Sequence, residues 1–160
     1  MVNEKIAELN TILSQQVRLY CELKSLSEKK KAALVKNDIQ ELAEIVILEE
    51  QLILSAGVLE RERLVWAERF LLTAGQEESD LTLAELAEAY PELGDVHEEL
   101  KSVVGELQLM HESNKLLLNQ AIKIMNYTVN LFNQADESVY LRPGSKKRSA
   151  AKLKLLDKQI

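Results

Sequence analysis

The chain has 160 residues and a net charge of −6, with five glycines, two prolines and one cysteine. So few turn-forming residues argue against a sheet or barrel protein. The lone Cys21 excludes an internal disulfide framework and any multi-cysteine metal site. No apolar run reaches the roughly 18 residues that span a bilayer. The composition therefore predicts a soluble all-α protein whose core consists mainly of aliphatic side chains.

The first predicted helix runs from about Asn3 to Lys36. Its apolar residues recur every three or four positions, as on one covered helix face. Asn37 and Asp38 interrupt the pattern, and Asp38 can cap a second helix by accepting a hydrogen bond from an N–H of its first turn. The sequence therefore predicts a helical hairpin. The recurring apolar residues are Ile6, Leu9, Leu13, Val17, Tyr20, Leu23 and Leu26.

The second predicted helix extends from Ile39 to about Thr73. It ends near Gly75, because glycine readily adopts the left-handed conformation that closes a helix. Its apolar residues again fall on one stripe, which we expect to face the core. This stripe contains Leu42, Ile45 or Val46, Leu52, Ala56, Leu59, Trp66 and Phe70.

A connector, residues 76–95, follows the second helix and contains a short helix of its own. Thr82 and Glu85 have the spacing of a capping box, in which each residue satisfies an N–H of the other. Pro91 stops the helix that this box begins. The connector is long enough to cross one end of a helical bundle.

The last predicted helix has the most regular pattern, and Asp95 can cap it. Apolar positions alternate steps of three and four, which indicates packing along nearly parallel or antiparallel axes, as in coiled coils. Only Asn114 and Thr128 interrupt the stripe, and a second apolar flank predicts contact with two neighbouring helices. The stripe comprises Leu100, Val103, Leu107, Met110, Leu117, Ala121, Ile124 and Leu131, and the flank comprises Val104, Leu118, Ile122, Met125, Val129 and Phe132.

The three long helices predict one elongated architecture. About 34 to 40 residues each correspond to roughly 50 to 60 Å at 1.5 Å per residue. Rods of matched length pack side by side, so we expect an elongated antiparallel three-helix bundle or coiled coil with a short crossing helix. The bundle domain should occupy residues 1–135, with its apolar stripes sealed inside, and residues 136–160 should form a flexible tail.

Three polar or small residues inside the predicted helices have open interpretations. Asn114 either sets the register of the helices or hydrogen-bonds a partner, with the first the simpler explanation. Gly57 and Gly105 each mark a kink, a close backbone approach or simple tolerance, since glycine destabilises a helix interior by about 1 kcal/mol. If the second and last helices are antiparallel, Gly105 falls near Trp66 and can seat its indole.

Nothing in the sequence predicts a catalytic, cofactor or metal site. His97 and His111 lack the His-Glu-x-x-His and Glu-x-x-His spacings of zinc and di-iron sites, and we expect both at the surface. Phosphate-binding glycine loops, Gly-x-Ser-x-Gly and Cys-x-x-Cys are absent from the sequence. Cys21 is explained more simply as a small half-buried helix residue than as a nucleophile. We therefore do not expect an enzyme.

The C-terminal tail differs in charge from the rest of the chain. Residues 141–160 carry seven Lys and Arg residues and one Asp, or +6, which leaves −12 for residues 1–140. Residues 146–160 can form an amphipathic helix, which would be marginal in isolation. Either this segment docks on a partner, or it is a solvated, disordered terminus or a flap over the bundle. Its candidate partner-binding residues are Leu153, Leu155, Leu156 and Ile160.

Three stretches of the chain resemble the FlgN-type flagellar export chaperones. Residues 28–63, EKKKAALVKNDIQELAEIVILEEQLILSAGVLERER, are similar to that family's first hairpin. Residues 114–132, NKLLLNQAIKIMNYTVNLF, resemble its last long helix, and residues 139–144, VYLRPG, resemble its tyrosine-containing exit. The resemblance implies a type III export chaperone that holds hook-filament junction (hook-associated) subunits before secretion.

The resemblance also assigns roles within the tail. Tyr140 matches the tyrosine that helps such chaperones dock the flagellar export gate, and Leu153, Leu156 and Ile160 become cargo-contact candidates. We expect the protein in the cytoplasm, since residues 1–9 contain neither a secretory nor a lipidation signal.

The sequence is less consistent with nucleic acid or a membrane as the partner. The acidic body disfavours nucleic acid, and the tail lacks the composition for stable membrane insertion. A coiled-coil scaffold without export cargo is the alternative function, and a weak homodimer is an open question.

Overall fold

The computed structural model describes residues 1–75 and 81–139, with side chains described up to Glu137. The chain divides into two compact units, Met1–Asn119 and Gln120–Ile160. The described part is all-α, as predicted, with helices α1 (Val2–Lys36), α2 (Ile39–Ala74), α3 (Leu83–Ala89) and α4 (Gly94–Val139) and a 3₁₀ helix, η1 (Pro91–Leu93). The predicted division into domain 1–135 and tail 136–160 stays a prediction, since residues 140–160 lie outside the described residues.

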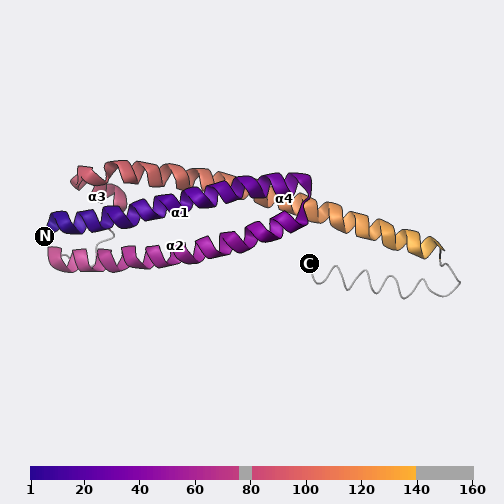
Figure 1. Ribbon diagram of the computed structural model, residues 1–160, viewed down its shortest axis with the longest axis horizontal. Helices are drawn as coiled ribbons and strands as arrows, with labels where there is room; N and C mark the ends of the chain where they lie inside the picture. Colours follow the sequence, from indigo (N-terminus) through magenta and orange to yellow (C-terminus); the bar gives the residue numbers. More distant parts are fainter. Residues whose placement is uncertain (76–80, 140–160) are drawn as a thin grey trace. The chain divides into compact units, whose positions relative to one another are not determined.

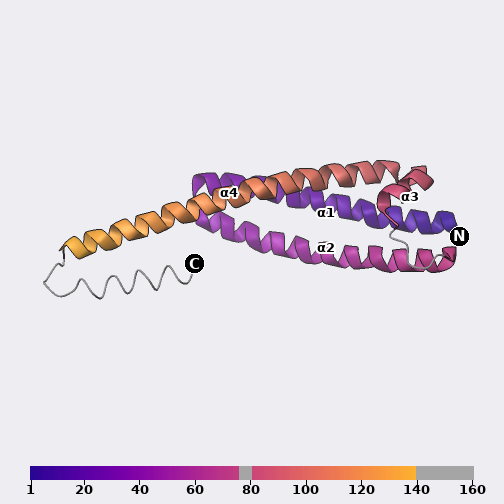
Figure 2. The same cartoon turned by 180° about the vertical axis from the view of Figure 1, so that it is seen from behind.

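In the first unit, α1, α2 and the first part of α4 form the predicted three-helix bundle. Both views show α1 and α2 running antiparallel, with α4 beginning at the end of the bundle where α1 begins (Figures 1 and 2). The short α3 lies at that same end of the bundle. The chain therefore runs up, down and up again, and α3 with η1 makes the crossing between the second and third rods.

The hairpin turn follows the sequence prediction. Asn37 adopts the left-handed conformation, φ 59° and ψ 35°, and its N–H donates to the carbonyl groups of Ala33 and Leu34. Asp38 then caps α2, because its Oδ1 accepts a hydrogen bond from the backbone N–H of Glu41 at 3.0 Å. Asparagine tolerates positive φ better than other non-glycine residues, so two adjacent side chains reverse the chain without a glycine.

The ends of the connector also follow local sequence signals. Gly75 closes α2 with φ 64°. Thr82 and Glu85 form the predicted capping box: the N–H of Glu85 donates to Thr82 Oγ1 at 3.3 Å, and the N–H of Thr82 donates to Glu85 Oε2 at 2.9 Å. This backbone donor, with the Thr82 hydroxyl, lowers the pKa of the Glu85 carboxyl below its usual range.

The predicted cap of the last helix is wrong. Asp95 lies inside the first turn of α4, which begins at Gly94. Gly94 already has helical backbone angles, φ −58° and ψ −47°, and its N–H donates to the carbonyl of Pro91. Because η1 runs directly into α4, there is no extended residue that a side chain could cap, and Asp95 only contributes its negative charge near the helix start.

The core is densest where α3 and η1 cross the bundle. Trp66 is 2% exposed there, and its indole Nε1 donates to the carbonyl of Lys5 at 2.7 Å. The indole stacks on Phe70 at a centroid distance of 4.8 Å, and Phe70 meets Tyr90 edge to face at 6.3 Å. The buried apolar cluster contains Ile6, Leu9, Ile12, Leu13, Trp66, Leu86, Leu93 and Val96.

The predicted glycine seat for the indole is wrong. A Cβ atom added at Gly105 or at Gly57 would meet nothing within 4 Å, so neither glycine marks a close approach. Trp66 instead belongs to the same cluster as Leu93 and Val96. The connector brings the first turn of α4, not the turn that contains Gly105, level with the indole.

Asn114 fixes the register between α1 and α4. It is buried, and its Nδ2 donates to the carbonyl of Ser27, 87 positions earlier, at 2.9 Å. The buried pair Leu9 and Val96, which share the core cluster, is also 87 positions apart. The side chain of Asn114 thus serves the inside of the bundle, which supports the register interpretation rather than a partner contact.

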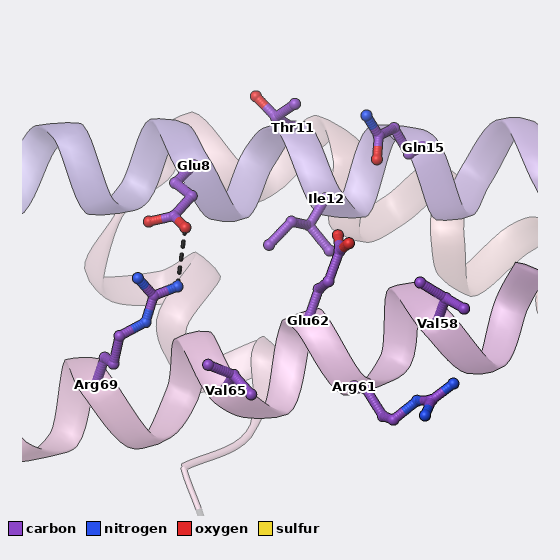
Figure 3. A pocket seen from close by; sticks show the side chains of 9 residues that line it. All are labelled: Glu8, Thr11, Ile12, Gln15, Val58, Arg61, Glu62, Val65 and Arg69. Carbon is purple, nitrogen blue, oxygen red and sulfur yellow. Dashed lines mark hydrogen bonds and ion pairs between the residues drawn. The ribbon is translucent and has the colours of Figure 1, made fainter.

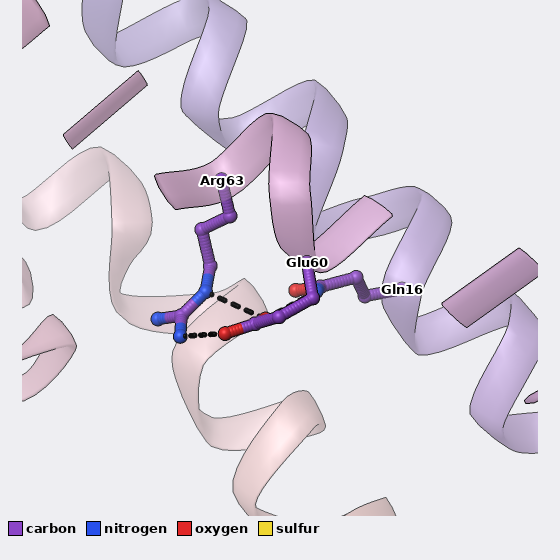
Figure 4. Close-up of polar contacts among 3 residues, drawn as sticks. All are labelled: Gln16, Glu60 and Arg63. Atoms are coloured by element: carbon purple, nitrogen blue, oxygen red, sulfur yellow. Dashed lines mark hydrogen bonds and ion pairs between the residues drawn. The ribbon is translucent and has the colours of Figure 1, made fainter. Parts of the chain in front are cut away.

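Polar contacts also fix the position of α1 relative to α2. Arg63 donates to both carboxylate oxygens of Glu60, at 3.0 and 2.5 Å, and Gln16 of α1 donates to the same carboxylate at 3.2 Å (Figure 4). The hydrogen bonds from Arg63 hold the pKa of Glu60 below its usual range. Because Gln16 is buried, this contact ties one level of α1 to one level of α2.

The Trp66 cluster generates a stability prediction. Trp66→Ala should lower the free energy of unfolding by about 3–5 kcal/mol, because it opens a cavity in the cluster where α1, α2, α3, η1 and α4 meet. Trp66→Phe should cost less, since a ring remains and only the bond to Lys5 and part of the packing are lost. Urea unfolding should be followed by far-UV circular dichroism, because Trp66 is the sole tryptophan.

Leu72→Ala provides the control, since Leu72 lies on the same helix with its side chain exposed. It should change the free energy of unfolding by no more than about 0.5 kcal/mol. If Trp66→Ala is as mild as this control, the cluster does not hold the bundle together.

Candidate functional site

The residues that the sequence singled out for partner binding have no described position. Tyr140, Leu153, Leu155, Leu156 and Ile160 all lie outside the described residues. Their roles therefore stay predictions, and the candidate surfaces among the described residues lie on α1, α2 and α4.

The second unit, described from Gln120 to Val139, exposes one apolar side of α4. Six apolar side chains between 122 and 132 are 40% to 70% exposed. At 100° per residue they fall on about half of the helix circumference, and asparagines at 126, 130 and 133 occupy the other half. We name this surface the α4 apolar face; it consists of Ile122, Ile124, Met125, Val129, Leu131 and Phe132.

This exposure corrects the sequence prediction that all apolar stripes of the last helix are sealed inside. Exposure begins within the first unit, where Leu116 and Leu118 are already 65% and 37% exposed. α1 and α2 have 35 and 36 residues, whereas α4 has 46, so the helices of the hairpin are shorter than α4. The missed signal was the length of the apolar pattern of α4, which continues to Phe132.

The α4 apolar face can bind by burying apolar area rather than by pairing charges. Among residues 120–137, only Lys123, Asp136 and Glu137 carry charge. Thr128, the polar residue within the apolar half, donates its hydroxyl to the carbonyl of Ile124 at 2.9 Å and so needs no partner. An exposed apolar stripe of this kind is complementary to another amphipathic helix.

The first unit has shallow grooves but no assembled reaction centre among its described side chains. The groove between α1 and α2 has a volume of about 540 Å³, and Val58, Val65 and Ile12 line it (Figure 3). The ion pair between Arg69 and Glu8, 3.0 Å apart, crosses it near one end. This groove offers apolar and polar contacts to a partner.

The residues that sequence analysis considered as reactive candidates, Cys21, His97 and His111, do not form a common site. Cys21, expected to be half-buried, is exposed on α1. His111 is exposed as expected, whereas His97 is half-buried, with Nδ1 3.9 Å from Glu98 Oε1. Within residues 1–75 and 81–139, no group of three or more His, Cys, Asp or Glu side chains is placed to hold a metal ion. No helix described here is long and apolar enough to cross a membrane.

A comparison with known families gives a match. The family described as FlgN protein matches residues 1–148, which covers both helices of the hairpin, the connector and all of α4. No curated protein and no solved structure matches the chain at a significant level. Because the match extends over nearly the whole sequence, and the all-α bundle agrees with the resemblance found in the sequence, this chain belongs to the FlgN family of flagellar export chaperones.

Proposed function

We propose that this chain binds hook-filament junction (hook-associated) subunits in the cytoplasm, prevents their premature assembly and delivers them to the flagellar export gate. The observation that carries the proposal is the α4 apolar face. A chaperone for subunits that assemble through apolar helices needs an apolar surface of its own, and this one is exposed on a helix that matches the family.

The chemistry of the α4 apolar face suits reversible binding. Fully burying one aliphatic or aromatic side chain contributes about 1.5–3 kcal/mol. Six half-exposed side chains can therefore offset a substantial part of the roughly 4–15 kcal/mol cost of association, without the very high affinity that would block release. Since few charges take part, binding should depend only weakly on salt.

The tail supplies the finer roles in this proposal. Leu153, Leu155, Leu156 and Ile160 extend the cargo contact beyond α4, and Tyr140 docks the export gate. The resemblance of residues 139–144 to the family's exit segment supports the second assignment. Ordering a segment on binding costs free energy, which again favours release at the gate.

Met125→Asp should weaken binding of a purified hook-associated subunit at least tenfold, because it places a charge in the middle of the α4 apolar face. The matched control is Asn130→Asp, which introduces the same side chain on the polar half of the same helix and should leave binding within about twofold. Isothermal titration calorimetry measures both. Equal affinities of the two variants would show that cargo does not use this face.

Deleting residues 141–160 should abolish pull-down of a hook-associated subunit while leaving thermal unfolding of the bundle almost unchanged. The expected reason is that the deletion removes the proposed apolar contacts at Leu153, Leu156 and Ile160 but none of the core residues. Undiminished pull-down would show that the tail does not bind cargo, and the α4 apolar face would then be the remaining proposed cargo site.

Tyr140→Ala should leave cargo binding unchanged and weaken binding to the export gate, since Tyr140 is proposed to contact only the gate. The two affinities should be measured separately, with the purified cytoplasmic gate component and with the hook-associated subunit. Tyr127→Ala, at an exposed tyrosine on the polar side of α4, is the control. Parallel loss of both activities in Tyr140→Ala contradicts this division of labour.

A further inference from the structure

The second unit carries two rows of largely apolar residues along α4. Both rows have steps of three, four and three residues, which is the spacing of a coiled-coil seam. They are offset by one residue, so they run side by side along the helix, about 100° apart. Together they contain the whole α4 apolar face. We name them seam one, which consists of Ala121, Ile124, Thr128 and Leu131, and seam two, which consists of Ile122, Met125, Val129 and Phe132.

The two seams differ in side-chain size. Every residue of seam two is large, and its four side chains are 40% to 70% exposed. Seam one alternates small and large residues, since Ala121 and Thr128 separate the exposed Ile124 and Leu131. The Thr128 hydroxyl is already bonded to the Ile124 carbonyl and needs no polar group from a partner. A helix packed on seam one therefore finds recesses at Ala121 and Thr128 that large side chains of its own can fill.

One partner helix cannot cover both seams. Leu131 on seam one and Val129 on seam two lie about 160° apart around α4, at 100° per residue. A coiled-coil seam that faces a single helix is narrower than an ordinary apolar helix side of about 100°. The width of this surface therefore fits two helices that lie side by side on α4.

Occupants that come from this chain itself cover only part of the surface. A twofold pair of α4 helices would cover one seam in each copy and leave the other exposed. Residues 146–160 can supply one amphipathic helix, which again covers one seam. A stable interface takes roughly 20 to 30 residues from each partner. One seam supplies four of these and both seams supply eight, so a partner that contributes two helices uses the surface fully.

We propose that the hook-associated subunit contributes two helices to the complex, one packed on seam one and the other on seam two. The helix on seam one carries large apolar side chains opposite Ala121 and Thr128. Neither helix carries a charge opposite the seams, because a charge buried there without a partner is unfavourable. Asp136 occupies the next position of seam two and marks its end. This inference rests on the proposed function, since it specifies how the cargo occupies α4.

Three consecutive residues test the two seams separately. Val129 lies on seam two, Asn130 on the polar half of the helix and Leu131 on seam one, and all three are exposed. Val129→Asp and Leu131→Asp should each weaken binding of a purified hook-associated subunit at least tenfold, as measured by isothermal titration calorimetry. Asn130→Asp is the matched control and should stay within about twofold of the unchanged chain.

The possible failures of this test are distinguishable. Loss of affinity in only one of the two apolar variants would mean that a single helix docks, which overturns the two-helix proposal and leaves the proposed function standing. A subunit that does not bind the unchanged chain would overturn the proposed function, and this inference with it.

Thr128→Phe tests the fit on seam one. The substitution enlarges the apolar surface but fills a recess, so it should weaken binding roughly fivefold or more, whereas unspecific apolar adhesion would strengthen it. Asn130→Phe adds the same ring on the polar half and should leave the affinity within about twofold. Unchanged or tighter binding by Thr128→Phe would overturn the packing of a helix on seam one.

Photo-cross-linking identifies the two helices directly. In a Cys21→Ser background, Val129→Cys and Leu131→Cys are labelled with a benzophenone maleimide, irradiated in complex with the subunit and mapped by mass spectrometry. The two positions should label two separate segments of the subunit, and Asn130→Cys should label it only weakly. One segment shared by both positions would overturn the proposal. A label on residues 141–160 or on a second copy of this chain would overturn it too, since the subunit would then not supply both helices.

Discussion

The position of α4 along the hairpin governs which surfaces this protein exposes. The start of α4 is anchored because Leu93 and Val96 join the cluster around Trp66, and Asn114 repeats the same register further along by bonding the Ser27 carbonyl. Only the Nδ2 donor of this buried amide is bonded, while its Oδ1 has no partner among the described residues, and any slip along the helices would leave the donor unsatisfied as well. α1 and α2 have 35 and 36 residues and α4 has 46, so the hairpin is too short to cover the whole apolar pattern of α4.

The exposed apolar residues between Ile122 and Phe132 have a functional consequence. A helix that continues its apolar pattern past the end of its covering partners retains an unsatisfied hydrophobic surface, and such a surface favours association with other amphipathic helices. The α4 apolar face is nearly free of charge and its polar half is rich in asparagine, so contact area rather than ion pairing should govern its affinity. This suits a chaperone that must bind a cargo helix and later release it without consuming energy.

The sequence by itself determined the elements and their ends. Asn37, Asp38, Gly75 and the Thr82–Glu85 capping box act within a few residues, so local chemistry was sufficient to predict them. The three-helix bundle followed from the apolar pattern, and the family resemblance came from residues 28–63, 114–132 and 139–144. Only the tertiary structure decided the contacts between helices. Leu93 and Val96 rather than Gly105 lie beside Trp66, η1 makes a cap by Asp95 unnecessary, and Ile122 to Phe132 stay exposed. Periodicity identifies the face that a helix can bury, but the axial register and the length of the neighbouring helices decide how much of that face is covered.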